Sequence, residues 1–96
     1  MIFKKLKINN IHLKNRIVVS PMCQYSAKKG CPTIWHYNHL SKLANSGAGM
    51  IMIESTAVNN NGKITHQDLC LNNNFQERKF KKLKKYINSF SNTPIG

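Results

Sequence analysis

Residues 17–25 read Ile-Val-Val-Ser-Pro-Met-Cys-Gln-Tyr, a short β-branched run followed by a loop that carries a thiol and a phenol. The first three residues predict a strand that is buried on both faces, as in a parallel sheet. Ser20-Pro21 ends this strand, because proline has no N–H for a sheet ladder and restricts the residue before it. In α/β proteins, ligands bind at the carboxyl ends of parallel strands. Cys23 and Tyr25 are therefore candidate site residues.

Strand and helix signals alternate along the rest of the chain. Residues 3–13 predict a hairpin, because an Asn-Asn pair is a turn signal between two short extended runs. A helix is expected from Thr33, as its N-cap, to about residue 45, followed by a wholly apolar strand over residues 50–53 that Glu54 closes. The apolar face of this helix is expected to comprise Trp35, His39, Leu40, Leu43 and Ala44.

A polar excursion precedes a second helix. The Asn-Gly pair at residues 61–62 favours a tight turn, so we expect a small hairpin that returns through residues 63–65. The helix should begin near Asn74 as its cap, with Glu77 in the first turn, where a negative charge complements the helix dipole. Residues 94–96 are then the start of a third strand, and this alternation predicts a parallel sheet. The apolar positions of the second helix are Phe80, Leu83, Ile87 and Phe90.

Composition and net charge limit the classes of protein to which the chain can belong. The 96 residues suffice for one small domain, and 15 Lys and Arg against 3 Asp and Glu give a formal charge of +12. That charge permits a nucleic acid or another polyanion as partner, but lysines on solvated faces account for it more simply. The cysteines show no disulfide framework, and no leader or membrane-spanning stretch is visible. We therefore expect a soluble, cytoplasmic protein.

Several motifs resemble the Old Yellow Enzyme family, and in particular its bacterial branch of NADPH dehydrogenases and ene-reductases. They are Leu13-Lys14-Asn15-Arg16-Ile17, Ser20-Pro21-Met22-Cys23-Gln24-Tyr25, Trp35-His36 and Glu54-Ser55-Thr56-Ala57-Val58. The resemblance implies an α/β fold that is the N-terminal portion of a (β/α)8 TIM barrel, with a pre-barrel hairpin, two βα units and the start of a third strand. Residues 1–96 would be a single incomplete domain, because a whole barrel takes roughly 250 residues.

The resemblance also implies a site for non-covalently bound FMN. A thiol near the reactive edge of the flavin ring can tune its redox potential, although a lone cysteine is otherwise a small buried hydrophobe. A small residue at position 57 would let the backbone approach a flat ring, and close packing at a strand end is the alternative. The residues that would contact the ring are Ser20, Pro21, Met22, Cys23 and Ala57.

Tyr25 is the candidate catalytic and substrate-binding residue. In related enzymes the matching tyrosine donates a hydrogen bond to the carbonyl oxygen of an enone, and so stabilises the charge that develops there during hydride delivery. The alternative interpretation is a packing aromatic whose hydroxyl needs only some polar partner.

The implied function is that of an FMN-dependent NAD(P)H oxidoreductase. NADPH or NADH gives hydride to FMN, and the reduced flavin passes it to an activated alkene or a quinone, the small-molecule substrate. For these 96 residues alone we expect weak FMN binding or none, and no turnover. A complementary polypeptide or a homo-oligomer is the partner to consider. The alternatives are a small basic polyanion-binding protein and a non-functional truncated gene product.

No metal site is predicted. Cys23, Cys31, His36 and His39 lack the spacing of paired zinc-binding motifs. The two histidines are instead expected to be hydrogen-bonded helix residues in or near the core.

Overall fold

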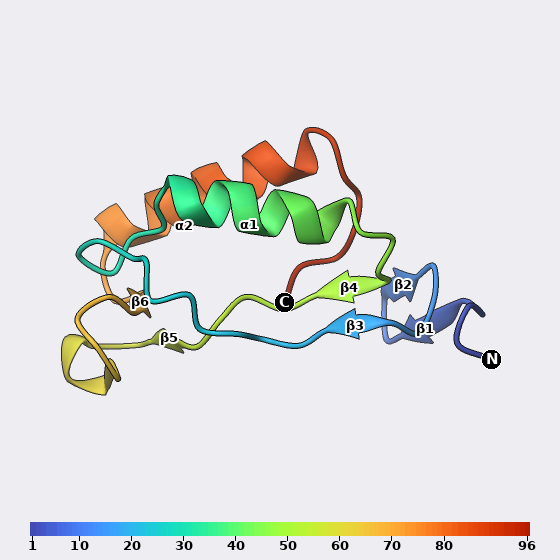
Figure 1. Cartoon of the computed structure of the whole chain (residues 1–96), viewed down its shortest axis with the longest axis horizontal. Coiled ribbons are helices and arrows are strands. Elements are labelled where there is room, and N and C mark those ends of the chain that lie inside the picture. Colours follow the sequence, from blue (N-terminus) through green and yellow to red (C-terminus); the bar gives the residue numbers. More distant parts are fainter.

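The computed structural model describes all residues from Met1 to Gly96, which form a layer of two helices over a line of short strands (Figure 1). No helix is both long and apolar enough to cross a membrane. The helices are α1 (Ile34–Ala44) and α2 (Asn74–Asn88), with a 3-10 turn η1 (Asn60–Gly62). The strands are β1 (Leu6–Ile8), β2 (Ile11–Leu13), β3 (Val18–Val19), β4 (Met50–Ile51), β5 (Thr56–Ala57) and β6 (Leu69–Cys70).

The strands confirm the predicted order of a hairpin followed by a parallel arrangement. β1 and β2 pair antiparallel around a turn in which Asn9 has a φ of 51°. β3 and β4 pair in parallel, and β5 pairs in parallel with β6. Ile95 forms a parallel bridge with Ile51 on the other side of β4, so the third strand is confirmed.

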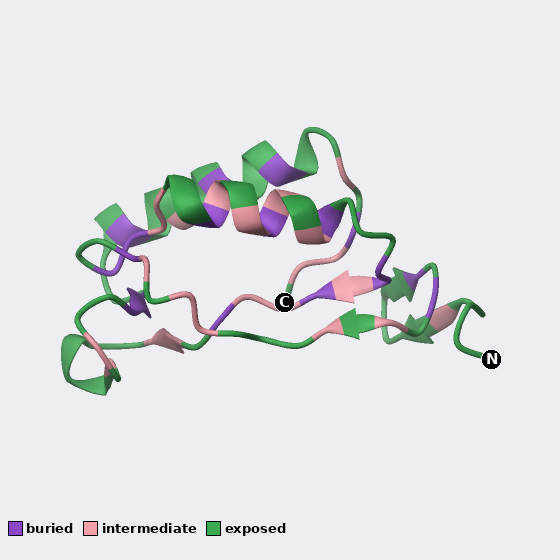
Figure 2. Cartoon of the chain, viewed as in Figure 1, coloured by how far each residue is buried: buried purple, intermediate pink, exposed green.

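The core lies between the two helices and β4. Apolar residues three or four positions apart form one buried stripe on each helix, because that spacing returns to the same helix face. Figure 2 shows these buried segments in purple on both helices and on the strand line below them. The cluster consists of Leu40, Ala44, Ala48, Ile51, Leu83 and Ile87.

Two predicted core positions on the helices are wrong. Trp35 is 53% exposed, because the side chain that α1 buries in its first turn is His36. Phe90 is 44% exposed, since α2 ends at Asn88 and residue 90 no longer follows the helical period.

The prediction that the first strand is buried on both faces is also wrong. Val18 is 47% exposed, because the helices cover only one face of β3 and no residue of this chain covers the other. The β-branched residues thus predicted a strand correctly, but the burial predicted for its second face was too high.

The polar excursion forms no hairpin. The Asn59 side chain accepts a hydrogen bond from the Gly62 N–H at 2.9 Å, which favours the 3-10 turn η1 over a tight β-turn. The chain then returns through a longer loop, so β6 lies parallel to β5. In addition, α2 is capped by Asn73, whose side chain accepts from the Gln76 N–H at 2.8 Å, and Asn74 is its first helical residue.

Candidate functional site

Two segments leave the parallel strands β3 and β4 at the same edge and continue side by side. The Met52 N–H donates to the Val19 carbonyl at 3.1 Å, so residues 20–25 start alongside residues 52–57. Further on, the backbone N–H of Gln24 faces the Glu54 carboxylate. The structure therefore brings the Ser-Pro-Met-Cys-Gln-Tyr loop and the Glu-Ser-Thr-Ala segment together, as parallel pairing requires.

In the first of these segments, the residues that the sequence predicts to contact the flavin ring are largely open to solvent. Ser20, Pro21 and Met22 are exposed, and Cys23 is half-buried. The backbone N–H groups of Met22 and Cys23 donate to no acceptor in the chain. This loop therefore offers unused hydrogen-bond donors next to a thiol.

Tyr25 has an unusual backbone conformation. Its φ is 50°, in the left-handed region that costs a residue with a Cβ about 1–2 kcal/mol, and its side chain is 50% exposed. Strain of this kind persists only where the surroundings fix the backbone, and it is frequent at functional sites. The exposed phenol is therefore held on a defined turn.

The first turn of α1 holds this loop in place. The Trp35 Nε1–H donates to Gln24 Oε1 at 2.9 Å, and the Thr33 hydroxyl donates to the Ser26 carbonyl at 2.9 Å. Gln24 Nε2 in turn donates to the Met22 carbonyl at 2.9 Å. Trp35, which the sequence analysis placed in the core, is therefore an anchor for the loop.

A buried His–Glu pair lies beneath the same loop. The Thr33 N–H donates to His36 Nδ1 at 2.9 Å, so the neutral imidazole carries its proton on Nε2. That Nε2 lies 3.4 Å from Glu54 Oε2, with the two side chains 1% and 4% exposed, and it has no hydrogen-bond partner. Thr33 thus orients the ring toward the end of β4.

Burial shifts both members of this pair toward their neutral forms. It lowers the pKa of His36 and raises the pKa of Glu54, although the Gln24 N–H and the nearby His39 oppose the second shift. Burial also lowers the pKa of His39. Sequence reasoning placed His36 near the core but missed its partner. The sequence signal that could have identified this partner was Glu54 itself, a lone acidic residue directly after an apolar strand.

Ala57 lies in β5, next to the loop that leaves β3. It pairs with Cys70, and its carbonyl accepts from the Leu71 N–H at 2.8 Å. The backbone at Ala57 is thus fixed by β6, which was not expected from the sequence. The other two thiols, of Cys31 and Cys70, are free but buried.

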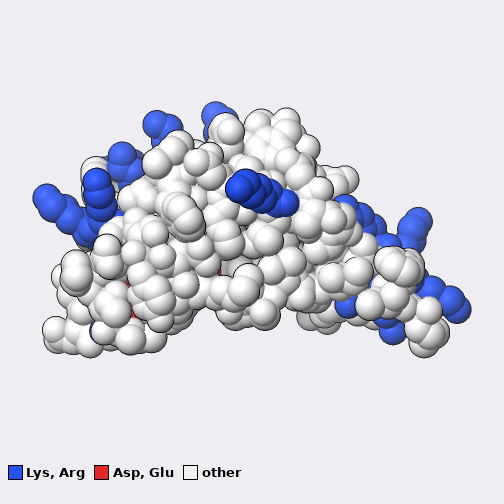
Figure 3. All heavy atoms as spheres, viewed as in Figure 1, with Lys and Arg blue, Asp and Glu red and all other residues white.

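In the view of Figure 3 the basic side chains gather over the helices and around the hairpin end, and the surface over the strands is mostly free of charge. In this view the surface over the strands offers little positive charge to a polyanion.

Comparisons with known proteins show the family and the fold of the chain. The NADH:flavin oxidoreductase / NADH oxidase family matches residues 1–91. An NADPH dehydrogenase of Listeria monocytogenes is 43% identical over 84 residues, which cover 85% of this chain and 25% of that protein.

Solved structures show the fold. Morphinone reductase matches 99% of this chain and 25% of its own, with a TM-score of 0.88 and 18% identity. The old yellow enzyme from Trypanosoma cruzi matches 92% of this chain and 24% of its own, with a TM-score of 0.81 and 21% identity. The fold is thus that of a portion of a TIM barrel. The chain spans about a quarter of the length of the relatives it matches, and it belongs to the NADH:flavin oxidoreductase / NADH oxidase family.

Proposed function

We propose that this chain forms one wall of a non-covalent FMN site in an NAD(P)H-dependent oxidoreductase of the ene-reductase type. The observation that carries the proposal is that residues 20–25 and residues 52–57 leave the same edge of the parallel strands side by side. FMN, when bound, supplies the relay of hydride from NADPH or NADH to an activated alkene or a quinone. The residues of the chain position the flavin ring and adjust its redox potential.

The hydrogen-bond donors and the lack of charge in the loop after β3 suit an isoalloxazine ring. The free N–H groups of Met22 and Cys23 and the half-buried thiol are donors for a ring whose edge carries acceptors. Ser20, Pro21 and Met22 carry no charge, and Ala57 adds no bulk on the neighbouring segment. We assign Ser20, Pro21, Met22, Cys23 and Ala57 to the cofactor.

Tyr25 is assigned to the substrate. Its phenol is exposed on a backbone turn that the neighbouring residues fix. A phenol can donate to the carbonyl oxygen of an enone and stabilise the negative charge that develops as hydride arrives. This is the catalytic role we propose for this chain.

The proposal concerns a quarter of the relatives' length. The strands and helices seen here amount to two βα units and a third strand, whereas a barrel closes with eight of each. We propose that residues 1–96 are part of a larger flavin-binding domain. The chain by itself should not turn over NADPH with cyclohexenone.

A chimera tests the proposal. Residues 1–91 of this chain replace the matching segment of the Listeria NADPH dehydrogenase, and the purified chimera is examined for bound flavin and for NADPH-dependent reduction of cyclohexenone. Retained flavin and turnover are expected. Tyr25→Phe should lower kcat, whereas Tyr37→Phe, a matched change of a tyrosine on α1, should not. A folded chimera that binds no flavin contradicts the proposal.

A further inference from the structure

Contacts on both sides of Tyr25 fix its left-handed backbone, whose φ is 50°. On the N-terminal side, the Gln24 side chain accepts from the Trp35 Nε1–H at 2.9 Å. On the C-terminal side, the Ser26 hydroxyl donates to the Gln24 carbonyl and the Ser26 carbonyl accepts from the Thr33 hydroxyl, both at 2.9 Å. Strain at one residue persists when its neighbours are held in this way. The backbone N–H of Gln24 is one further point of attachment.

The Glu54 carboxylate is where the Gln24 N–H and the His36 ring meet. The Gln24 N–H faces this carboxylate, and His36 Nε2 lies 3.4 Å from Glu54 Oε2. Because His36 Nδ1 accepts the Thr33 N–H at 2.9 Å, the neutral ring carries its proton on Nε2. Two N–H donors therefore converge on one carboxyl group, and the ionised carboxylate accepts from both because it carries no proton of its own.

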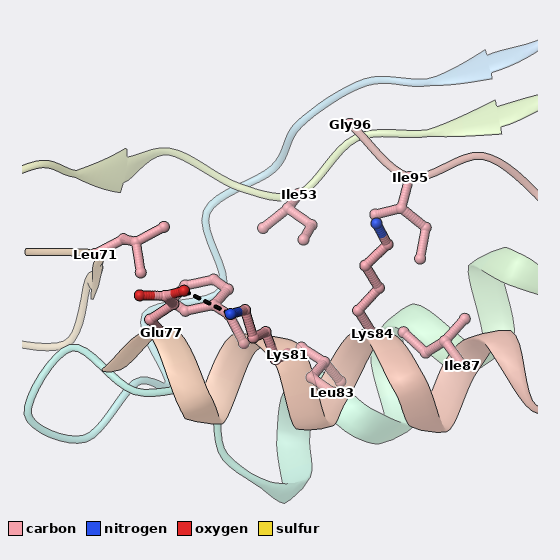
Figure 4. A pocket seen from close by; sticks show the side chains of 10 residues that line it. Ile53, Leu71, Glu77, Lys81, Leu83, Lys84, Ile87, Ile95 and Gly96 are labelled. Carbon is pink, nitrogen blue, oxygen red and sulfur yellow. Dashed lines mark ion pairs between the residues drawn. The ribbon is translucent and has the colours of Figure 1, made fainter. Parts of the chain in front are cut away.

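The other ion pair of the chain lies in the open. Lys81 and Glu77 pair at 2.7 Å along α2, as Figure 4 shows, and their side chains are 74% and 49% exposed. Water screens such a pair, so it contributes little. His36 and Glu54 are almost fully buried, where a charge must be both paired and hydrogen-bonded. The buried pair is therefore the one that can fix a backbone segment.

Stability alone does not explain the buried carboxylate. Burial raises the pKa of Glu54, so the fold favours the neutral acid over the ion. The Gln24 N–H and His39 on α1 oppose that shift, and Asp68, in the loop before β6, adds to it. An ion that burial disfavours, but that two N–H donors hold, is suited to positioning those donors.

We propose that Glu54 is a positioning residue for the loop after β3, and that His36 orients its carboxylate. The carboxylate acts through the loop backbone, because the Gln24 amide that it holds lies between Cys23 and Tyr25. The value of this positioning for the reaction rests on the proposed function, in which the loop faces the flavin. The positioning itself is a property of the chain without flavin.

A pH titration of the 15N- and 13C-labelled full chain tests the contact without any substitution. The Gln24 amide shift should follow the same midpoint as the Glu54 side-chain carboxyl carbon, because protonation removes the charged acceptor of this N–H. The Ile64 amide is the internal control, because it donates to Asp68 Oδ2 at 2.7 Å and should follow that carboxyl group instead. A Gln24 amide that does not titrate with Glu54 overturns the proposal.

Glu54→Gln tests the consequence for the backbone of the loop. An amide has one acceptor oxygen and a donor NH2 group, so it cannot serve both N–H donors. The strong intraresidue Hα–HN nuclear Overhauser effect that marks a positive φ should therefore weaken at Tyr25. It should persist at Asn9 and Lys29, whose φ is 51° and which lie on other turns.

The thiol of Cys23 gives a second readout. In Glu54→Gln it should react with a thiol reagent about tenfold faster than in the native chain, the change that the net loss of one hydrogen bond allows. The buried Cys31 and Cys70 should stay unreactive, which shows that the fold is intact. Asp68→Asn is the matched control, because it neutralises a buried carboxylate that holds N–H groups of another loop. It should change neither readout.

His36→Leu tests whether the imidazole acts through the carboxylate. The double variant with Glu54→Gln should go no further than Glu54→Gln alone, because the two side chains act as one unit. An additive double variant, or folded Glu54→Gln with an unchanged Tyr25 signal and Cys23 rate, overturns the proposal. If Glu54→Gln exposes the buried thiols, the titration of the native chain decides. No flavin is present in these measurements, so their failure is independent of the FMN assignment.

Discussion

Gly30 joins the loop that follows the candidate site to β6 and α2, and we predict that alanine there is strongly destabilising. Its φ is 74°, and its carbonyl accepts the Cys70 N–H at 2.9 Å. An added Cβ would lie 2.7 Å from the Cys70 Cβ and 2.5 Å from Gln76 Nε2. Gln76 is also engaged, because its Nε2 donates to the Lys29 carbonyl at 3.1 Å.

Three contributions set the size of the effect. The left-handed backbone costs a residue with a Cβ about 1–2 kcal/mol, and overpacking against Cys70 costs about 1–3 kcal/mol. Displacing Gln76 from Lys29 loses about 1 kcal/mol of hydrogen bonding. Gly30→Ala should therefore lower the free energy of unfolding by about 3–6 kcal/mol.

Gly47 provides the matched control. Its φ is 92°, but no heavy atom lies within 4 Å of an added Cβ. Gly47→Ala should therefore cost only the backbone contribution, about 1–2 kcal/mol. Urea denaturation followed by the fluorescence of Trp35, the single tryptophan, measures both variants. The reasoning is refuted if Gly30→Ala is no less stable than Gly47→Ala.

Three further predictions test other parts of the structure. Cys23 should react with a thiol reagent in the native chain, whereas the two buried thiols react only on unfolding, and a rapid phase that survives Cys23→Ala would contradict this. Asn73→Ala should cost about 1 kcal/mol in urea denaturation through loss of the α2 cap, while Asn74→Ala costs nothing. Burial holds the pKa of His36 below its usual 6.5, because the fold disfavours the protonated ring. The neutral ring therefore contributes stability above pH 6.5, and this contribution is lost as the pH falls through the lowered pKa. Glu54, whose pKa is raised above 4.5, contributes stability at low pH that is lost as the pH rises. Between pH 7 and 5, His36→Gln should therefore lose less stability than Glu54→Gln, and equal pH profiles would argue against the shifts.

Local periodicity and turn chemistry were enough to predict most elements. The spacing of Leu40 and Ala44 and of Leu83 and Ile87 predicted both buried helix faces, and these four residues form the centre of the core. Thr33 was correctly predicted as the N-cap position of α1, although its hydroxyl bonds to Ser26 and its backbone N–H to the His36 ring.

Features that depend on distant contacts could not be predicted in this way. The hairpin expected after β5 is absent, because the Asn59 side chain captures the turn and β6 pairs in parallel. The burial of Val18 was overestimated, since composition does not reveal whether a second layer is present. The pairing of His36 with Glu54 brings together a helix and a strand end that are distant in sequence.

The central claim is that residues 20–23 and Ala57 contact the flavin ring, and amide shift mapping of the 15N-labelled full chain tests it most directly. Riboflavin, FMN and inorganic phosphate are compared at millimolar concentration, where even a dissociation constant of about 1 mM gives measurable occupancy. We predict that riboflavin and FMN shift the amides of Met22, Cys23 and Ala57 alike and that phosphate does not. Shifts produced only by FMN and phosphate, and confined to the basic residues 78–85 of α2, would contradict the claim and favour a polyanion-binding surface.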